Sequence, residues 1–95
     1  MPTVQTWRVS PETRLRWRTW GDETVVFHPG SADTHKLSAI GAEALRRLER
    51  DELSTQQLAE HLASEMGLDC DDDLVRSIDE LVAQFDELGL VERVP

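Results

Sequence analysis

The chain has 95 residues, of which 39% are hydrophobic and 31% are charged, and its formal net charge is −9. That length allows one small domain with a single core. Residues 1–50 carry eight Lys/Arg and six Asp/Glu, whereas residues 51–95 carry two and thirteen. An acidic half of this kind repels phosphate backbones and anionic membranes, and it favours basic or neutral partners.

No stretch of about 18 apolar residues is present, so no transmembrane helix is expected. Residues 1–8 lack the apolar core that signal peptides contain. The single cysteine, Cys70, has no second cysteine with which to form an internal disulfide. These features predict a cytoplasmic location.

The N-terminal third has the alternation typical of β-strands. Residues 1–12 are expected to be partly irregular, with a short strand at Thr6–Val9. Arg14–Trp20 alternates strictly between two faces, and this period predicts a half-buried strand. One face has Leu15, Trp17 and Thr19, and the other has Arg14, Arg16, Arg18 and Trp20.

Two further strands are predicted after turn signals. Gly21-Asp22 predicts a turn, and the β-branched and aromatic segment Thr24–His28 predicts a second strand. Pro29-Gly30-Ser31 is a second turn signal, and Asp33–Leu37 predicts a third strand at an edge of the sheet. Because the connections are too short for crossovers, the three strands should form an antiparallel meander.

The apolar period then changes to that of helices. Ser38 can cap a first helix, and Asp51-Glu52 should lie in the turn that follows it. Ser54 to Gln57 forms a capping box for a second helix, which Gly67 should end. The inward residues of these two helices are expected to be Ile40, Ala44, Leu45, Leu48, Leu58, Leu62 and Met66.

The third helix is predicted to begin at Asp71 or Asp72 and to end at Gly89, with Leu90 folding back on Phe85. Residues 91–94 should form an extended tail. The whole chain, residues 1–95, is then a single α+β domain in two layers. It has a three-stranded antiparallel sheet followed by three helices, in a winged-helix-like order. The apolar stripe of the third helix consists of Leu74, Ile78, Leu81, Phe85 and Leu88.

Metal sites are weakly indicated. The acidic run Asp69–Asp73 with Glu80 approaches the pattern of a calcium loop, but Leu74 stands where the loop needs glycine. These aspartates are better interpreted as helix-capping residues. The spacings of the three histidines and Cys70 match no zinc pattern. We therefore expect no metal and no cofactor.

Catalysis is also not expected. No serine stands in a G-x-S-x-G elbow, and neither a G-x-G-x-x-G nor a Walker loop is present. The predicted third helix has seven Asp/Glu and only Arg76 as a cation, so it is a poor reader of DNA. The row of Arg14, Arg16 and Arg18 with Trp20 can contact RNA, but a solvated sheet face is the simpler interpretation.

A peptide site is a further possibility. The edge strand Asp33–Leu37 offers unpaired backbone groups, and Val75 and Val82 lie one heptad apart beside the apolar stripe of the third helix. An edge strand beside an apolar strip suits β-augmentation, in which an extended peptide adds a strand. A simpler role for the two valines is that they widen the core. The residues alone favour neither role over the other.

The order and spacing of several motifs resemble the PqqD-like family of peptide chaperones, whose fold is also called the RiPP recognition element. The resemblance covers Arg14 to Val91. It consists of Leu15-Arg16, Val25-Val26-Phe27-His28-Pro29, Lys36-Leu37-Ser38, Ala44-Leu45-x-x-Leu48, Leu53-Ser54-x-x-x-Leu58 and Phe85-x-x-Leu88-Gly89-Leu90-Val91. The segment Trp7-Arg8-Val9 also resembles a subgroup that accompanies an HPr-kinase-related protein. The chain departs from the family at His28-Pro29, where Tyr-Pro is common, and at Asp51-Glu52, where Asp-Gly is common.

This resemblance implies a non-catalytic adaptor that captures a precursor or leader peptide by strand addition and presents it to a modifying enzyme or a kinase-related protein. No DNA or membrane partner is expected, and the chain should be a monomer or homodimer. The alternatives are a winged-helix nucleic-acid binder and a structural or dimerisation module. The implied peptide-binding residues are Asp33, Thr34, His35, Lys36, Leu37, Val75, Ile78, Asp79 and Val82.

Overall fold

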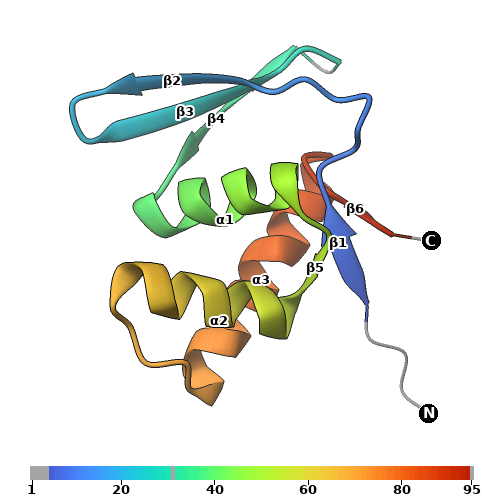
Figure 1. Cartoon of the computed structure of the whole chain (residues 1–95). Coiled ribbons are helices and arrows are strands. Elements are labelled where there is room, and N and C mark those ends of the chain that lie inside the picture. Colours follow the sequence, from blue (N-terminus) through green and yellow to red (C-terminus); the bar gives the residue numbers. More distant parts are fainter. Residues whose placement is uncertain (1–4, 31, 95) are drawn as a thin grey trace.

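Two antiparallel sheets and three helices make up the computed structural model, which describes residues 5–30 and 32–94 (Figure 1). The predicted α+β class is confirmed, although the second sheet was not foreseen. In chain order the elements are β1 Thr6–Arg8, β2 Arg16–Trp20, β3 Glu23–His28, β4 Asp33–Leu37, α1 Ala39–Arg50, β5 Leu53–Ser54, α2 Thr55–Met66, α3 Asp72–Glu87 and β6 Glu92–Arg93.

The larger sheet is the predicted meander, in the order β2-β3-β4. A two-residue loop joins β2 to β3, and its first residue, Gly21, has a φ of 53°. A glycine with positive φ at that position matches the right-handed twist of the strands. Strand β4 has the predicted bounds, whereas β2 begins two residues later than expected. Ser31, in the predicted second turn, lies outside the described residues.

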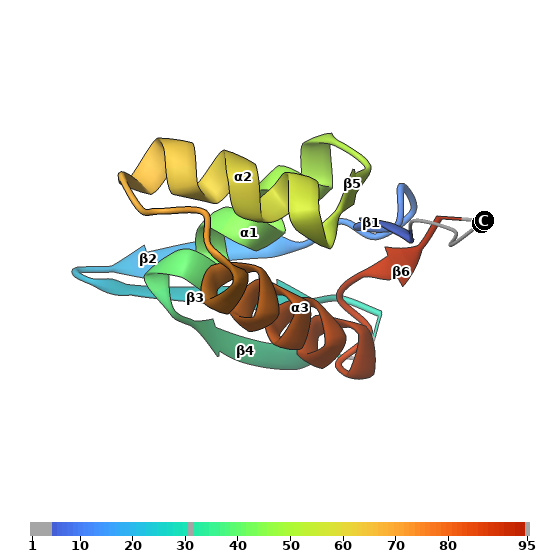
Figure 2. The ribbon, with the colours of Figure 1, turned by 90° about the horizontal axis from the view of Figure 1, so that it is seen from below.

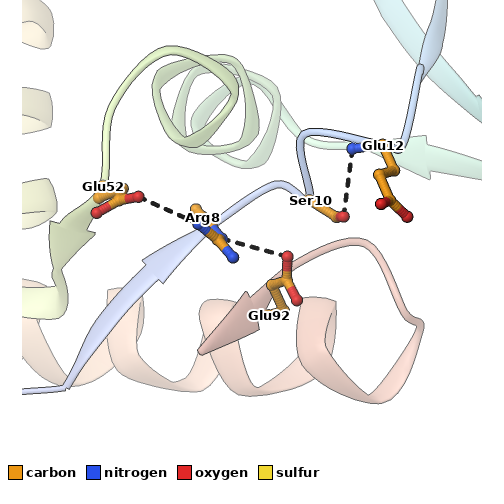
Figure 3. A network of polar contacts seen from close by, with 5 residues as sticks. All are labelled: Arg8, Ser10, Glu12, Glu52 and Glu92. Atoms are coloured by element: carbon orange, nitrogen blue, oxygen red, sulfur yellow. Dashed lines mark hydrogen bonds and ion pairs between the residues drawn. The ribbon is translucent and has the colours of Figure 1, made fainter. Parts of the chain in front are cut away.

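The smaller sheet contains the short strand expected at Thr6–Val9, as β1, and it corrects the expectation of an unpaired C-terminal tail. Strand β1 lies between β5 and β6. The backbone of Trp7 stands opposite Leu53 on one side and Arg93 on the other. The side chain of Arg8 forms ion pairs with Glu52 at 3.3 Å and Glu92 at 3.2 Å, as Figure 3 shows. The N-terminal strand β1 is thus held to the C-terminal strand β6 and to β5 by contacts between residues distant in sequence.

The helix ends follow the predicted capping chemistry. The Ser38 hydroxyl accepts a hydrogen bond from the Gly41 N–H and begins α1. Ser54 and Gln57 form the reciprocal capping box of α2. Helix α3 ends in a left-handed glycine, Gly89 (φ 76°), and the Leu90 N–H donates to the Phe85 carbonyl at 2.9 Å. These caps supply partners to backbone groups that the helix ends would otherwise leave unpaired.

The three helices all lie on one side of the larger sheet (Figures 1 and 2), and the core lies among these helices, the inner face of that sheet and the smaller sheet. Contrary to expectation, Thr19, Met66 and Leu88 are exposed. None of the described helices is both long and apolar enough to span a membrane. The buried cluster comprises Trp7, Val9, Val26, Ala44, Leu45, Leu48, Leu53, Leu58, Ala59, Leu62, Ile78, Val82, Phe85, Leu90 and Val91.

Candidate functional site

Strand β4 has a free edge. It pairs with β3 on one side and with no other described strand. The two-residue turn of the preceding hairpin closes on the pair Trp20 and Glu23, and a pair at such a turn is hydrogen-bonded. In an antiparallel ladder the bonding direction alternates from residue to residue. Both registers run without a bulge, so this alternation can be counted from that pair through β3 to β4. It directs the backbone N–H and C=O groups of Thr34 and Lys36 to the free edge.

The side chains of β4 alternate between the two faces of the sheet. His35 stands opposite Val26, which is fully buried, so His35 and Leu37 face the helices. Thr34 and Lys36 face away from the helices and are exposed. The ammonium group of Lys36 lies 2.7 Å from the Glu23 carboxylate. Asp33 is exposed at the start of the strand. The strand therefore offers polar backbone groups at its edge and the side chains of His35 and Leu37 toward the helices.

A groove of about 290 Å³ lies between β4 and α3. Its strand side consists of residues 34–38, and its helix side consists of Leu81, Gln84, Phe85 and Leu88, with Gly41 of α1 between them. Leu88 is 40% exposed, whereas Phe85 is 2% exposed and forms part of the core. An unpaired strand edge beside a partly apolar groove is the arrangement that β-augmentation requires.

Helix α3 does not present the predicted residues to this groove. Ile78 and Val82 are each 1% exposed within the core, which favours the core interpretation of Val82 over a groove contact. Val75 and Asp79 line a different cleft of about 540 Å³, which Trp7 and Thr55 also line. The Thr55 hydroxyl donates to the Asp79 carboxylate there at 3.3 Å. The predicted helix residues are thus divided between the core and the flank that faces away from the groove.

Helical geometry explains which residues the sequence interpretation missed. Successive residues are rotated by 100°, since a turn takes 3.6 residues. Taking the buried Ile78 and Phe85 as the centre of the core stripe, Leu81, Gln84 and Leu88 lie on one flank of it and Val75 and Asp79 on the other. The sequence could distinguish these flanks, but only the packing of α3 reveals which one faces β4.

The side chain of His35 contains an unusual polar atom. Its Nε2 is buried and has no hydrogen-bond partner among the described residues. A buried polar atom without a partner costs about 1–3 kcal/mol. His35 also lines the groove. Because this nitrogen is itself buried, a ligand in the groove could bond to it only if the His35 side chain moved.

The family comparison agrees with this geometry. Residues 23–91 match the family model described as "Coenzyme PQQ synthesis protein D (PqqD)". The chain belongs to the PqqD family. The matched region contains β3, β4 and all three helices, including both sides of the groove, whereas β1 and β2 precede it.

A solved structure is also similar to this PqqD-family chain. It is described as "TbiB1 in Complex with the TbiA(beta) Leader Peptide", and its TM-score is 0.69. The sequences are 18% identical, and the match covers 90% of this chain and 94% of that one. This likeness shows a shared fold. No curated protein sequence matches the chain.

The polar surface of this PqqD-family chain is strongly acidic along α3. Among the described residues, no three His, Cys, Asp or Glu side chains gather where they could hold a metal ion. Cys70 is exposed near the start of the helix. Arg76 is the cation of α3, and the exposed acidic residues of the helix are Asp72, Asp73, Asp79, Glu80, Asp86 and Glu87. Such a surface is unsuited to a phosphate backbone and attracts basic groups.

Proposed function

We propose that this chain is a non-catalytic adaptor that captures a precursor or leader peptide on the free edge of β4. The observation that carries the proposal is the unpaired edge of β4 beside the groove that Leu81, Gln84 and Leu88 line. Membership of the PqqD family supports it. A further support is that the similar structure TbiB1 is described in complex with a leader peptide.

The peptide would extend the larger sheet from three strands to four. Thr34 and Lys36 would exchange up to four backbone hydrogen bonds with it, each contributing about 0.5–1.5 kcal/mol. Alternate peptide side chains would enter the groove against Leu37, Leu81 and Leu88. The groove therefore suits apolar residues at every second position, and the acidic surface of α3 favours basic residues nearby.

The partner of the adaptor is a modifying enzyme in this proposal, with the chain in the cytoplasm as a monomer or homodimer. The resemblance at Trp7-Arg8-Val9 supports a kinase-related protein as that partner. The structure gives these residues packing roles as well, because Trp7 and Val9 are buried and Arg8 forms two ion pairs. Genes adjacent to this one would identify the enzyme.

The test is a pair of substitutions at one residue of the free edge. Lys36→Pro removes an N–H that points away from β3, and prolines are tolerated at such edge positions. Lys36→Ala removes the side chain and its exposed ion pair but retains the N–H. Synthetic peptides covering the N-terminal halves of short open reading frames beside the gene serve as probes, with calorimetry as the measurement. We expect Lys36→Pro to weaken binding about five- to tenfold and Lys36→Ala less than about threefold.

A matched control comes from the neighbouring residue. The N–H of His35 bonds to β3, so His35→Pro should destabilise the sheet itself. Circular dichroism should show that Lys36→Pro remains folded. If folded Lys36→Pro binds the peptide as well as the unmodified chain does, strand addition at β4 is wrong.

A further inference from the structure

The larger sheet has an outer face, turned away from the helices. This face combines apolar and basic residues. In Figure 1 the helices lie below this sheet, and no described element covers the upper face. A hollow of about 310 Å³ is lined by Arg16, Arg18 and Trp20 of β2, Val25 and Phe27 of β3, and Thr34 of β4. Because opposed residues share a face, the registers stack Arg16, Phe27 and Thr34 in one row and Arg18 and Val25 in the next.

The centre of this outer face is apolar. Val25 and Phe27 are half-buried although no described element packs on them. Trp20 is 55% exposed, the highest value among the large exposed hydrophobic residues of the described chain. The Arg18 guanidinium lies 5.9 Å from the centre of the Trp20 ring. Aromatic residues and arginine at the centre of an exposed patch are typical of protein interfaces.

The charge of the outer face is opposite to that of the whole molecule. The chain carries a net charge of −9, yet Arg16 and Arg18 flank this hollow. Neither arginine forms an ion pair with any residue in the described part of the chain, and both are exposed. Unneutralised cations around an apolar centre complement a partner whose acidic side chains surround an apolar patch.

We propose that the outer face of the β2–β3–β4 sheet is a docking surface for a partner protein with an acidic, partly apolar surface. Symmetric self-association through this face is disfavoured, because a two-fold axis places the arginines of one copy near those of the other. A nucleic acid is disfavoured as well, because two free arginines are a small footprint in a chain of net charge −9. The site lies on a different surface from the groove beside β4, and it goes beyond the proposed peptide binding.

The test uses a designed probe, since the partner is unidentified. The probe is an 18-residue helical peptide with a leucine stripe flanked by glutamates, and a second version carries lysine in place of every glutamate. Binding to the full chain is followed by changes in backbone amide chemical shifts and by titration at two salt concentrations. We expect saturable shifts at residues 16–20 and 25–27 with the glutamate probe and weaker binding at higher salt.

Charge reversal on the outer face provides the decisive comparison. The double variant Arg16→Glu with Arg18→Glu should bind the glutamate probe at least about tenfold more weakly, because each charge reversal removes an attraction and adds a repulsion. The matched control, Arg50→Glu with Arg76→Glu, has the same net charge with both changes away from the outer face. It should weaken binding by less than about threefold. Circular dichroism checks that both variants remain folded.

Four results with the probe peptides overturn the proposal. They are no saturable binding, equal binding of the lysine probe, equal loss in the two double variants, and shifts confined to the groove beside β4. Tighter binding of a uridine oligonucleotide at the same residues and salt would assign the surface to nucleic acid instead. Sedimentation showing a dimer that only the Arg16/Arg18 variant dissolves would assign it to self-association. Each of these results is distinct from failure of the Lys36→Pro test.

Discussion

The two flanks of α3 lead to a quantitative prediction for Val82 and Leu88. Val82→Ala removes two methyl groups from a side chain that is 1% exposed. That loss is about 1.6 kcal/mol of transfer free energy, and the cavity left behind raises the total to about 2–3 kcal/mol. For a domain of this size the melting temperature should fall by about 10–20 °C. Leu88 is 40% exposed, so Leu88→Ala should lower stability by less than about 1 kcal/mol.

Peptide binding should respond in the opposite order. Leu88 lines the groove beside β4, and its truncation removes apolar contact worth about 1 kcal/mol, or about fivefold in affinity. Under conditions in which the Val82→Ala variant is folded, its affinity for the peptide should stay within about twofold of that of the unmodified chain. Urea denaturation followed by circular dichroism gives the stabilities, and calorimetry well below both melting temperatures gives the affinities. A stable Val82→Ala variant with weakened binding would refute the placement of Val82 in the core and support the groove role implied by the family resemblance.

Three other predictions concern stability. Gly89→Ala should destabilise the domain by about 1–2 kcal/mol in urea, because alanine is strained at the φ of 76° although no atom would obstruct its Cβ. Ser54→Ala should cost about 1 kcal/mol by removing the capping box of α2, which Ser54→Asp should largely preserve. Burial raises the pKa of the Glu49 carboxyl above its ordinary 4.5, and the opposing effects of Trp17 and Arg46 only partly offset this. Protonated Glu49 is therefore favoured by folding, and that contribution is lost as the pH rises through the raised pKa. Glu49→Gln should be the more stable form at pH 7, and its advantage in urea midpoint should vanish below about pH 4.5.

Local chemistry made much of the fold predictable. The bounds of β4 and the caps at Ser38, Ser54, Asp71 and Gly89 follow from side chains that act within a few residues of their position. The apolar stripe of α3 could be read from its period for the same reason. Helix propensity, capping and periodicity are properties of a short window of sequence.

The second sheet depends on contacts that no short window contains. Strands β5 and β6 have two residues each, which is too short for an alternating pattern. Arg8 is separated by 44 residues from Glu52 and by 84 from Glu92, so these ion pairs follow from the tertiary fold. Opposite charges this far apart in sequence have many alternative partners in a chain that is 31% charged.

The groove beside β4 includes Thr34–Leu37 from the predicted set but none of its helix residues, for a related reason. Val75 and Val82 attract attention because they are apolar residues beside the predicted stripe. Their flank is occupied by α2 and β1, as the cleft shared by Val75, Trp7 and Thr55 shows. Which flank of a helix faces a given strand is set by the crossing of the elements, and the sequence of one helix does not contain that information.

The two proposed surfaces are related through the geometry of an added strand. A peptide paired to β4 has side chains that alternate between the groove and the outer face, because strand residues alternate by their pleat. Those on the outer face would continue the row formed by Arg16, Phe27 and Thr34, since residues opposed across a sheet share a face. A protein docked on Arg16, Arg18 and Trp20 could then also contact alternate residues of the captured peptide. Such contacts would make peptide and partner bind cooperatively, with each raising the affinity of the other by the same factor. In that arrangement the sheet itself presents the peptide, and no movement of the helices is needed to bring peptide and partner together.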